Sequence, residues 1–427
     1  MSAYQVGGQV LPDTGDDAFQ FALADHYHNR KTEPPRCLCR DPSIPLYIAR
    51  VGDRYHLKRW PNTGGQHHYT CDKYEPPMET SGIGSLMGGA IKEEPLTGMT
   101  TLTVDFALKK VARGDMAPKA SVPEDEAADD KKSSASSDTR KLTLKSILHY
   151  LWDRSGFCRW TPTMEGKRNW AVISAYLNET AQTVQVKRQP LSQLLYIPPS
   201  WNQTDSERQK ARRQSVFAGF QTRSGPRRLV MVLGEVKTIE PSQFGYRLTL
   251  KHMGETRVYL SDRKLAEINQ RFGFELASWR QHGDPEDNGK PHHLMALLTA
   301  TVTETGVLQI EDLTLMILTP QWLPYFSLHD GLVVSTAVAL KRKFLKPMTY
   351  NLGKGRTLPS IILIDTQPIQ VNLFVKTPVD SDTLNRSREG LIEQSRGRSV
   401  IWDTSDVVSV FDWIEGLQQT RLLGADV

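Results

Sequence analysis

The stretch from Cys37 to Pro77, CLCRDPSIPLYIARVGDRYHLKRWPNTGGQHHYTCDKYEPP, decides how the front of this chain folds. A Cys-x-Cys pair stands at one end, and the sequence HHYTC stands near the other. Between them the pattern predicts a β-hairpin, with strands over 47–50 and 55–60 and a Gly-Asp turn. A hairpin brings its two ends together, so the two groups of metal-binding side chains should meet at one ion.

Three cysteines and one histidine are a donor set that zinc commonly takes in tetrahedral sites. The sequence therefore predicts Zn²⁺ bound by Cys37, Cys39 and Cys71, with either His67 or His68 as the fourth ligand. A site with four protein ligands has no open position for a substrate, so we expect it to be structural and not catalytic.

The alternative is that unrelated buried cysteines and surface histidines share this segment. Residues 34–80 are rich in Pro, Gly, Cys and His and cannot build a large apolar core, so a bound metal is the better explanation of their stability. His56 is an outside candidate for a ligand. Cys158, far away along the chain, is expected to pack in a helical core.

The composition is that of a folded chain, since 39% of the 427 residues are hydrophobic and 24% are charged. No stretch approaches the ~18 apolar residues of a membrane span, and the N-terminus lacks the pattern of a secretory signal. We therefore expect a cytoplasmic protein without membrane partners. Four cysteines are too few for a disulfide scaffold of this size, and the net charge of +5 permits an anionic partner without demanding one.

Composition and periodicity predict a multi-domain α+β protein. It should contain an N-terminal zinc-bound β-hairpin module, a helical, helix-turn-helix-like segment, an antiparallel β domain and a C-terminal α/β segment. The expected parts are a flexible arm over 1–33 with a short helix at Asp16–His26, the zinc module with a following strand over 34–113, a disordered linker over 114–140, the helical segment over 141–204, a basic tract and the antiparallel β domain over 205–320, and the α/β segment over 321–427.

Two amphipathic helices around a Gly-containing turn follow the linker, an order typical of helix-turn-helix DNA-binding units. In such units the start of the second helix meets base edges, which would place Lys167, Arg168 and Asn169 at the bases. Arg154 and Arg159 would then contact phosphates. The alternative is a plain helical bundle whose charges only solvate its surface.

A basic stretch precedes the predicted antiparallel sheet. Its cations are Arg208, Lys210, Arg212, Arg213, Arg223, Arg227 and Arg228, against the single acid Glu207. They favour contacts with the phosphates of DNA, where counterion release would supply much of the affinity and make it fall steeply with salt. A solvated helix is the alternative.

Two other patterns could indicate chemistry. Glu235-Val-Lys237 has the Glu-x-Lys form of metal-dependent nucleases, where a carboxylate holds Mg²⁺, although two solvent-facing residues on a strand are the commoner meaning. The glycine-rich run from Gly82 to Gly89 lacks the Gly-Lys-Ser/Thr ending of a phosphate-binding loop. A Mg²⁺-dependent nuclease and a protein-assembly subunit are thus the alternatives to a DNA-binding protein.

A series of sequence blocks, in chain order, resembles a bacterial family of unknown function. The blocks are CLCRDPSIPLYIAR, YHLKRWPNTGGQHHYTCDKYEPP, SGIGS, TLTVDFAL, LHYLWDRSGFCRW, GKRNWAV, RLVMVLGEVKTIEP and LTPQWLPY. That family is defined by three N-terminal cysteines and is carried mainly by plasmids and integrative conjugative elements. The resemblance covers about residues 37–376 and implies that Cys37, Cys39 and Cys71 are the family's cysteines. It implies no activity.

The C-terminal sequence FLKPMTYNLGKGRTLPSIILIDTQPIQVNLFVKTP resembles the core of restriction-endonuclease-like folds. There a Pro-Asp begins one strand and a Glu follows on the next. The matching places here read Pro359-Ser360 and Asn-Leu-Phe from Asn372, so the acids that would bind Mg²⁺ are missing. The resemblance implies an inactive copy, unless Asp365 and Lys376 form an atypical site.

The leading hypothesis is a zinc-containing, non-catalytic DNA-binding accessory protein of a bacterial mobile element. Its expected cofactor is Zn²⁺. Its expected partners are DNA and other proteins of the same element.

Overall fold

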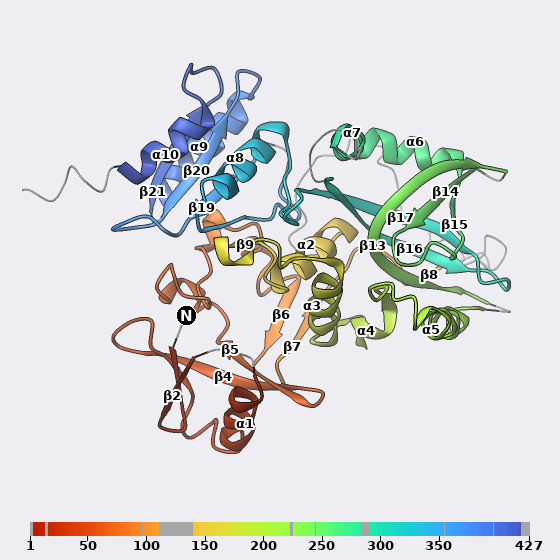
Figure 1. Ribbon diagram of the computed structural model, residues 1–427, viewed down its shortest axis with the longest axis horizontal. Coiled ribbons are helices and arrows are strands. Elements are labelled where there is room, and N and C mark those ends of the chain that lie inside the picture. The colour runs from red at the N-terminus through yellow and green to blue at the C-terminus, as the bar shows by residue number, and fades with distance from the viewer. Residues whose placement is uncertain are drawn as a thin grey trace, which may run out of the picture.

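The computed structural model describes residues 3–12, 16–95, 97–110, 140–222, 225–243, 245–282, 291–353, 355–395 and 397–419 (Figure 1). Helices and four β-sheets alternate along it, which confirms the α+β class. The linker predicted over 114–140 lies, except for residue 140, outside the described residues, and so does Arg223. No helix in the described ranges is long and apolar enough to cross a membrane.

The first sheet builds the N-terminal module, coloured red to orange in Figure 1, in the order β2-β1-β3-β4-β5. Its elements are β1 (Ala3–Val6), β2 (Gln9–Pro12), α1 (Asp17–His26), β3 (Arg36–Cys37), β4 (Ile44–Val51) and β5 (Arg54–Arg59). β4 and β5 pair antiparallel as the predicted hairpin. The predicted short helix is also confirmed, since Asp16 caps α1 by accepting a hydrogen bond from Phe19 N (2.9 Å).

The segment predicted as a flexible arm over 1–33 differs from that prediction, because much of it completes this module. β1 pairs with β3, so that Tyr4 stands opposite Cys37. The buried side chains that the segment contributes are Tyr4, Val6, Phe19, Leu23 and His26. Too few of its positions face the core to produce a recognisable period in the sequence.

The second sheet, in the order β11-β10-β7-β6, belongs to a unit with three helices. Its elements are β6 (Ile91–Glu94), β7 (Met99–Leu102), α2 (Leu144–Arg154), α3 (Trp170–Gln182), β10 (Val184–Val186), β11 (Gln189–Pro190) and α4 (Leu191–Leu194). The short 3-10 helices of the chain are η1 (Gly64–Gln66), η2 (Met78–Thr80), η3 (Gly84–Leu86) and η4 (Pro162–Met164).

The helices α2 and α3 do not support the predicted helix-turn-helix unit. Strand β9 (Arg159–Trp160) and η4 separate them, where such a unit has a tight turn. Eight of the eleven residues of α2 are buried, and α2 packs against both the second sheet's core and the next sheet. A helix that is buried on nearly every side belongs to the hydrophobic core and does not act as a DNA-recognition helix. Cys158 is buried in the same core, as expected.

The third sheet, green to teal in Figure 1, closes into a barrel where an antiparallel sheet was predicted. Its strands are β13 (Arg227–Ser242), β14 (Gly245–Leu250), β15 (Val258–Leu260), β16 (His293–Val302) and β17 (Leu308–Leu318). They pair in the order β13-β14-β15-β17-β16, and β16 pairs again with β13. All these pairs are antiparallel except β15–β17, which is parallel.

Short strands and helices surround the barrel. β8 (Lys109–Lys110) and β12 (Leu195–Tyr196) pair with β13, and the helices are α5 (Ser206–Ala218), α6 (Asp262–Arg271) and α7 (Gly273–His282). Alternate residues of β13 face opposite sides: Val230 and Val232 join the core of the barrel, whereas Met231 and Leu233 join the core around α2. Both sides of this strand are therefore buried.

The fourth sheet has the order β21-β20-β19-β18-β9 and forms the C-terminal unit, which is coloured blue in Figure 1 except for the yellow β9. Its elements are α8 (Leu328–Ala339), β18 (Phe344–Leu345), β19 (Ile361–Leu363), β20 (Val371–Lys376), α9 (Asp382–Gln394), β21 (Arg398–Asp403) and α10 (Val410–Gln419). β9 reaches this sheet from the helical unit, since Trp160 stands opposite Phe344. The C-terminal unit is thus joined by hydrogen bonds to the middle of the chain.

Candidate metal centre and nucleic-acid interface

The N-terminal sheet brings four metal-binding side chains together. Cys37 ends β3, between Tyr4 of β1 and Ile44 of β4. After β5 the chain passes through η1, and a hydrogen bond from Cys71 N to His68 O (2.8 Å) closes the following turn. We call residues 64–75 the metal-binding turn. The four side chains are Cys37, Cys39, His67 and Cys71, and their ligand atoms all lie within 4.8 Å of one another.

The distances between these atoms suit a tetrahedral ion. With metal–sulfur bonds of ~2.3 Å and metal–nitrogen bonds of ~2.05 Å, the edges of such a tetrahedron are about 3.6–3.8 Å long. The sulfurs of Cys37 and Cys71 are 3.6 Å apart. His67 Nδ1 lies 3.4 Å from the sulfur of Cys39 and 3.7 Å from that of Cys71. The group can therefore hold one metal ion with little rearrangement.

The surroundings of the four side chains keep water away from them. Cys37, His67 and Cys71 are buried and Cys39 is half-buried. The backbone N–H of Lys73 donates to the sulfur of Cys71 (3.4 Å), an interaction that favours a thiolate. His67 Nε2 is buried without a hydrogen-bond partner among the described residues, so packing orients this ring.

Without an ion, the crowded thiols resist ionisation. A hydrogen bond with Cys71, followed by burial, raises the pKa of Cys37, and burial raises the pKa of Cys39. Both effects penalise the charged sulfur. A bound dication would supply the opposite charge and hold the sulfurs as thiolates. The group thus has the donor atoms and the surroundings that could hold a metal ion.

The structure separates the two candidate histidines. His67 points at the sulfurs, whereas His68 stacks on Tyr69 (ring centroids 4.3 Å apart) and its Nδ1 is 2.8 Å from the hydroxyl of Thr70. His56, the outside candidate, lies on β5 with its Nδ1 3.2 Å from Glu179. Neither His68 nor His56 belongs to the four-residue group, so that the predicted ligand set is reduced to three cysteines and His67.

Two tyrosines of the metal-binding turn contact the C-terminal unit. The hydroxyl of Tyr69 donates to Thr366 O (2.9 Å), and that of Tyr74 donates to the side-chain oxygen of Gln370. Apolar residues of the C-terminal unit share one core with the turn. Leu345 of β18, Ile362 of β19 and Ile364 just after β19 belong to the same cluster as Tyr69, Cys71 and Tyr74. The metal group therefore lies at the junction of the N-terminal module and the C-terminal unit.

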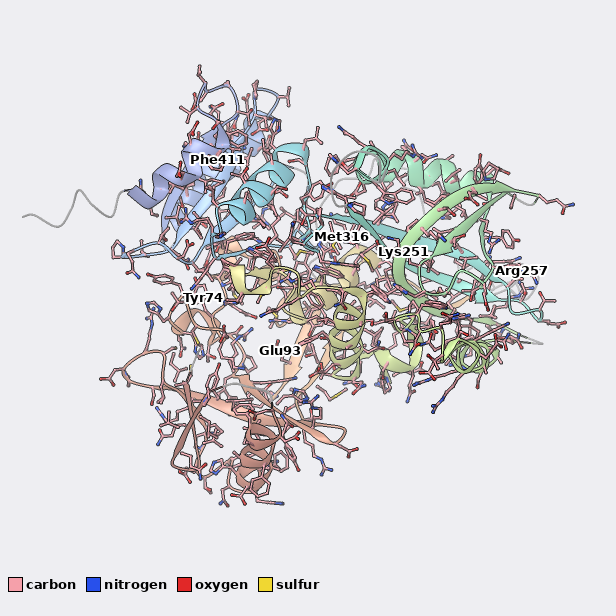
Figure 2. All side chains as sticks on the ribbon, in the orientation of Figure 1. Tyr74, Glu93, Lys251, Arg257, Met316 and Phe411 are labelled. Carbon is pink, nitrogen blue, oxygen red and sulfur yellow. The ribbon has the colours of Figure 1, made fainter. Side chains whose placement is uncertain are left out.

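Two of the predicted phosphate contacts line a cavity of about 530 Å³ between the N-terminal module and α2. Arg154 pairs with Glu75 of the metal-binding turn and with Glu93 of β6 (3.3 Å). Arg159 donates to two backbone carbonyls of the turn, at 2.9 and 3.4 Å. Figure 2 labels Tyr74 and Glu93, which line the same cavity. Both arginines thus have partners within the protein, which differs from the predicted contacts with phosphates.

The residues before α3 have structural roles as well. Arg168 donates to two loop carbonyls, at 3.1 and 3.4 Å, and burial lowers its pKa to about 10. Asn169 caps α3 by accepting a hydrogen bond from Val172 N (3.2 Å). Lys167 is exposed. Of the three residues predicted at the base edges, only Lys167 has no such internal contact in the described structure.

The basic tract divides into exposed and engaged cations. Arg208 and Arg212 on α5 are exposed, and Arg213 is buried. Lys210 lies 3.6 Å from Glu255 and 3.9 Å from Glu207, so nearby acids partly compensate its charge. On α5, the exposed cations Arg208 and Arg212 can therefore contact a partner.

Strand β8 adds two exposed lysines that sequence reasoning missed, although the pair stands beside the predicted linker. Lys109 lies opposite Arg228 and Lys110 opposite Arg227, and like charges placed opposite each other in a ladder are destabilising. Lys110 pairs with Glu311 (2.8 Å), while the other three have no ion-pair partner in the described part of the chain. We call Lys109, Lys110, Arg208, Arg212, Arg227 and Arg228 the basic surface.

The carboxylates proposed for a nuclease do not converge. Glu235 is buried, and one of its oxygens lies 2.6 Å from Lys251 Nζ and 2.7 Å from His293 Nδ1. Burial opposes ionisation, but the hydrogen bonds from these two partners lower the pKa of Glu235 overall. Lys237 is exposed on the same strand and does not join Glu235.

The two residues of the possible atypical nuclease site, Asp365 and Lys376, also pair with other side chains. Both oxygens of Asp365 accept hydrogen bonds from Arg342, at 2.9–3.2 Å. Lys376 pairs with Asp403 at 2.7 Å. Among the described residues, the Cys/His group is the only cluster of three or more side chains that could bind a metal.

Comparison with known proteins identifies one family. The family described as "protein of unknown function (DUF1173)" matches residues 4–405. Neither the curated proteins nor the solved structures give a match. The matched range contains the metal group, the barrel and most of the C-terminal unit, so the chain belongs to this family of unknown function.

Proposed function

We propose that the metal ion is Zn²⁺ and that it stabilises the junction between the N-terminal module and the C-terminal unit. Three thiolates and one imidazole in a closed, buried tetrahedron are a donor set typical of structural zinc. The turn that supplies two ligands has few apolar residues of its own, so the ion would provide much of its stability.

We further propose that the protein is a non-catalytic DNA-binding accessory protein of a bacterial mobile element such as a plasmid or an integrative conjugative element. The observation that carries this proposal is the pairing of Lys109 with Arg228 and of Lys110 with Arg227 across one ladder. Repulsion between these cations falls when a polyanion binds, and the release of counterions adds to the affinity.

The C-terminal unit fits the non-catalytic part of this proposal. Its order of helix, three antiparallel strands, helix and parallel strand, from α8 to β21, supports a likeness to restriction-endonuclease-like cores. At the places of the nuclease acids stand Ser360 and Asn372. Asp330 of α8, which lies beside Ser360, pairs with Lys346 (2.9 Å), so this carboxylate is engaged within the protein and is not a free ligand for Mg²⁺.

The basic surface is tested with a charge-matched pair of variants. Lys109→Ala/Arg227→Ala removes two of its cations, and Arg386→Ala/Arg398→Ala removes two exposed cations of the C-terminal unit. We expect the first variant to bind labelled DNA more weakly and to reduce the slope of log K against log salt by about 2, because each lost phosphate contact removes roughly 0.9 from it. The second variant should bind like the wild type.

Equal loss of affinity in the two variants would mean that net charge and not this surface attracts DNA. Absence of DNA binding by the zinc-loaded wild type at 50 mM salt would overturn the proposal itself. Cleavage of DNA by the wild type in Mg²⁺ or Mn²⁺ would instead identify a nuclease.

A further inference from the structure

The barrel has the strand order of a known class of nucleic-acid-binding folds. Counted from β13, its five strands pair in the order first, second, third, fifth, fourth and back to the first. α6 and α7 lie between the third and fourth strands, and the third and fifth are parallel. This is the topology of oligonucleotide/oligosaccharide-binding (OB) barrels, in which ligands lie across the second and third strands. Because a fold does not establish a function, the side chains on that face must carry the inference.

The outer surface of the barrel is covered on one side only. Outward residues of β13 and β16, among them Met231, Leu233 and Leu297, pack into the core around α2. On β14 and β15 the corresponding outward residues, Arg247 and Tyr259, are half-buried and belong to no described core cluster. The side left open is thus the one across which OB barrels bind their ligands.

The open side combines an aromatic ring with a cation that forms no ion pair among the described residues. Arg247 and Tyr259 stand directly opposite each other in the β14–β15 ladder, and Gln309 of β17 follows beside Tyr259. The Nη2 of Arg247 donates to Gly254 O (2.9 Å), while its Nε is buried without a partner among the described residues. The exposed acid Glu240 stands opposite Arg247 on β13, but beyond ion-pair distance. A base can stack on a tyrosine while the neighbouring guanidinium meets a phosphate.

The row formed by Arg247, Tyr259 and Gln309 has one end beside the basic surface. The turn at 303–307 between β16 and β17 is held on one side by Leu308 N, which donates to Arg257 O (2.9 Å), and on the other by Gln221, which donates to Thr303 O (3.0 Å). Figure 2 labels Arg257 at the outer edge of the barrel. Lys110 of the basic surface pairs with Glu311 on β17, two residues beyond Gln309. A strand that leaves the barrel face here would meet the exposed cations.

We propose that a single strand of nucleic acid binds across β14 and β15, with a base stacked on Tyr259, phosphates at Arg247 and Arg257, and its continuation on the basic surface. This inference rests on the DNA-binding function proposed above and adds the form of the ligand. Single strands are favoured over duplex because their unpaired bases can reach a ring that is half-buried in a sheet.

The experiment compares labelled oligothymidylate of about 15 nucleotides, a range that OB barrels can accommodate, with oligouridylate and a duplex of equal length. Tyr259→Ala should weaken binding of the single strand about tenfold and leave duplex binding within about twofold, since stacking on one aromatic ring is typically lost on alanine substitution. Tyr259→Phe keeps the ring and should bind like the wild type. Tyr176→Ala, which removes an exposed tyrosine of α3, is the matched control.

A second measurement needs no variant. Bound oligothymidylate should slow amide hydrogen exchange of the wild-type protein over residues 245–260, and a comparison with oligouridylate distinguishes DNA from RNA as the source of the strand. If duplex binds as tightly as the single strand and these residues gain no protection, the inference is overturned while DNA binding by the basic surface stands. If no nucleic acid binds, the proposed function fails and this inference fails with it.

Discussion

At the metal group, the position of single atoms decides which side chain can bind an ion. His67 and His68 are neighbours in the chain, yet only His67 directs a ring nitrogen at the sulfurs of Cys39 and Cys71. His68 uses its Nδ1 for Thr70 instead. A tetrahedral ion that loses one of four protein ligands gains an exchangeable position, so the two histidines should differ sharply when each is replaced.

We therefore predict that His67→Ala releases zinc and that His68→Ala retains it. Elemental analysis after dialysis against a mild chelator should give one zinc ion per chain for the wild type and for His68→Ala. His67→Ala should hold little, because even the loss of a residue that only orients a ligand typically lowers metal affinity ~10–100-fold, and the loss of a ligand itself should cost at least as much. Cys71→Ser, which replaces a thiolate by a hydroxyl, should also lose the ion.

Equal zinc contents in the two histidine variants would contradict the assignment of His67. A wild-type protein that binds no zinc after purification without chelator would contradict the site as a whole.

The same scale shows what a single sequence can predict about a site. The three cysteines were predictable because metal ligands come in close pairs at hairpin ends, and this spacing is local. The roles of the cations were not predictable, because the role of a charged side chain depends on which residue lies beside it in the fold. Arg154 pairs with Glu75 and Glu93, whereas Lys109 lies opposite another cation, Arg228. These partners are far apart along the chain.

At the scale of elements, α2 is a helix with eight of its eleven residues buried. Leu148, Leu151 and Trp152 are fully buried, and α2 lies between the second sheet and the barrel. Its amphipathic pattern correctly predicted a helix but not a helix buried on almost every side, because periodicity does not show how many neighbours will pack against it.

We predict that Leu148→Ala lowers the free energy of unfolding by about 2–5 kcal/mol, as expected for a buried leucine replaced in a core with little freedom to relax. Leu332→Ala is the matched control, since this leucine of α8 is 48% exposed. Its effect should remain within about 0.5 kcal/mol. Urea unfolding followed by circular dichroism measures both. Similar midpoints for the two variants would contradict the central position of α2.

The barrel marks the limit of prediction at this scale. Individual strands followed from alternating patterns, as in the hairpin of β16 and β17. Closure depends on β13 pairing with β16 and on the parallel pair β15–β17. In the sequence, α6, α7 and at least one further strand separate the two members of each pair. No local sequence pattern indicates such pairing. The predicted antiparallel domain therefore did not include closure into a barrel or an open binding face.

The whole molecule is organised around a junction of distant segments. The metal-binding turn shares a core with β18 and β19, and its Tyr69 and Tyr74 donate hydrogen bonds to the loop between β19 and β20, almost three hundred residues away along the chain. The sequence correctly indicated that the N-terminal part of the chain gathers side chains that could bind a metal ion, but it could not indicate which surface this module covers. An ion at the turn would therefore stabilise more than its own ligands.

This arrangement predicts the effect of metal removal. A chelator should increase amide hydrogen exchange in the metal-binding turn and also in residues 344–376 of the C-terminal unit, because loosening the turn uncovers Leu345, Ile362 and Ile364. Tyr69→Phe, which removes the hydroxyl that donates to Thr366 O, should produce a smaller increase in the same C-terminal residues without loss of zinc, in keeping with a hydrogen bond worth about 1 kcal/mol. β13 and β16 of the barrel are the internal control and should exchange as before. If the effect of the chelator remains confined to the N-terminal module, the ion organises that module alone and the junction is held by packing that needs no metal.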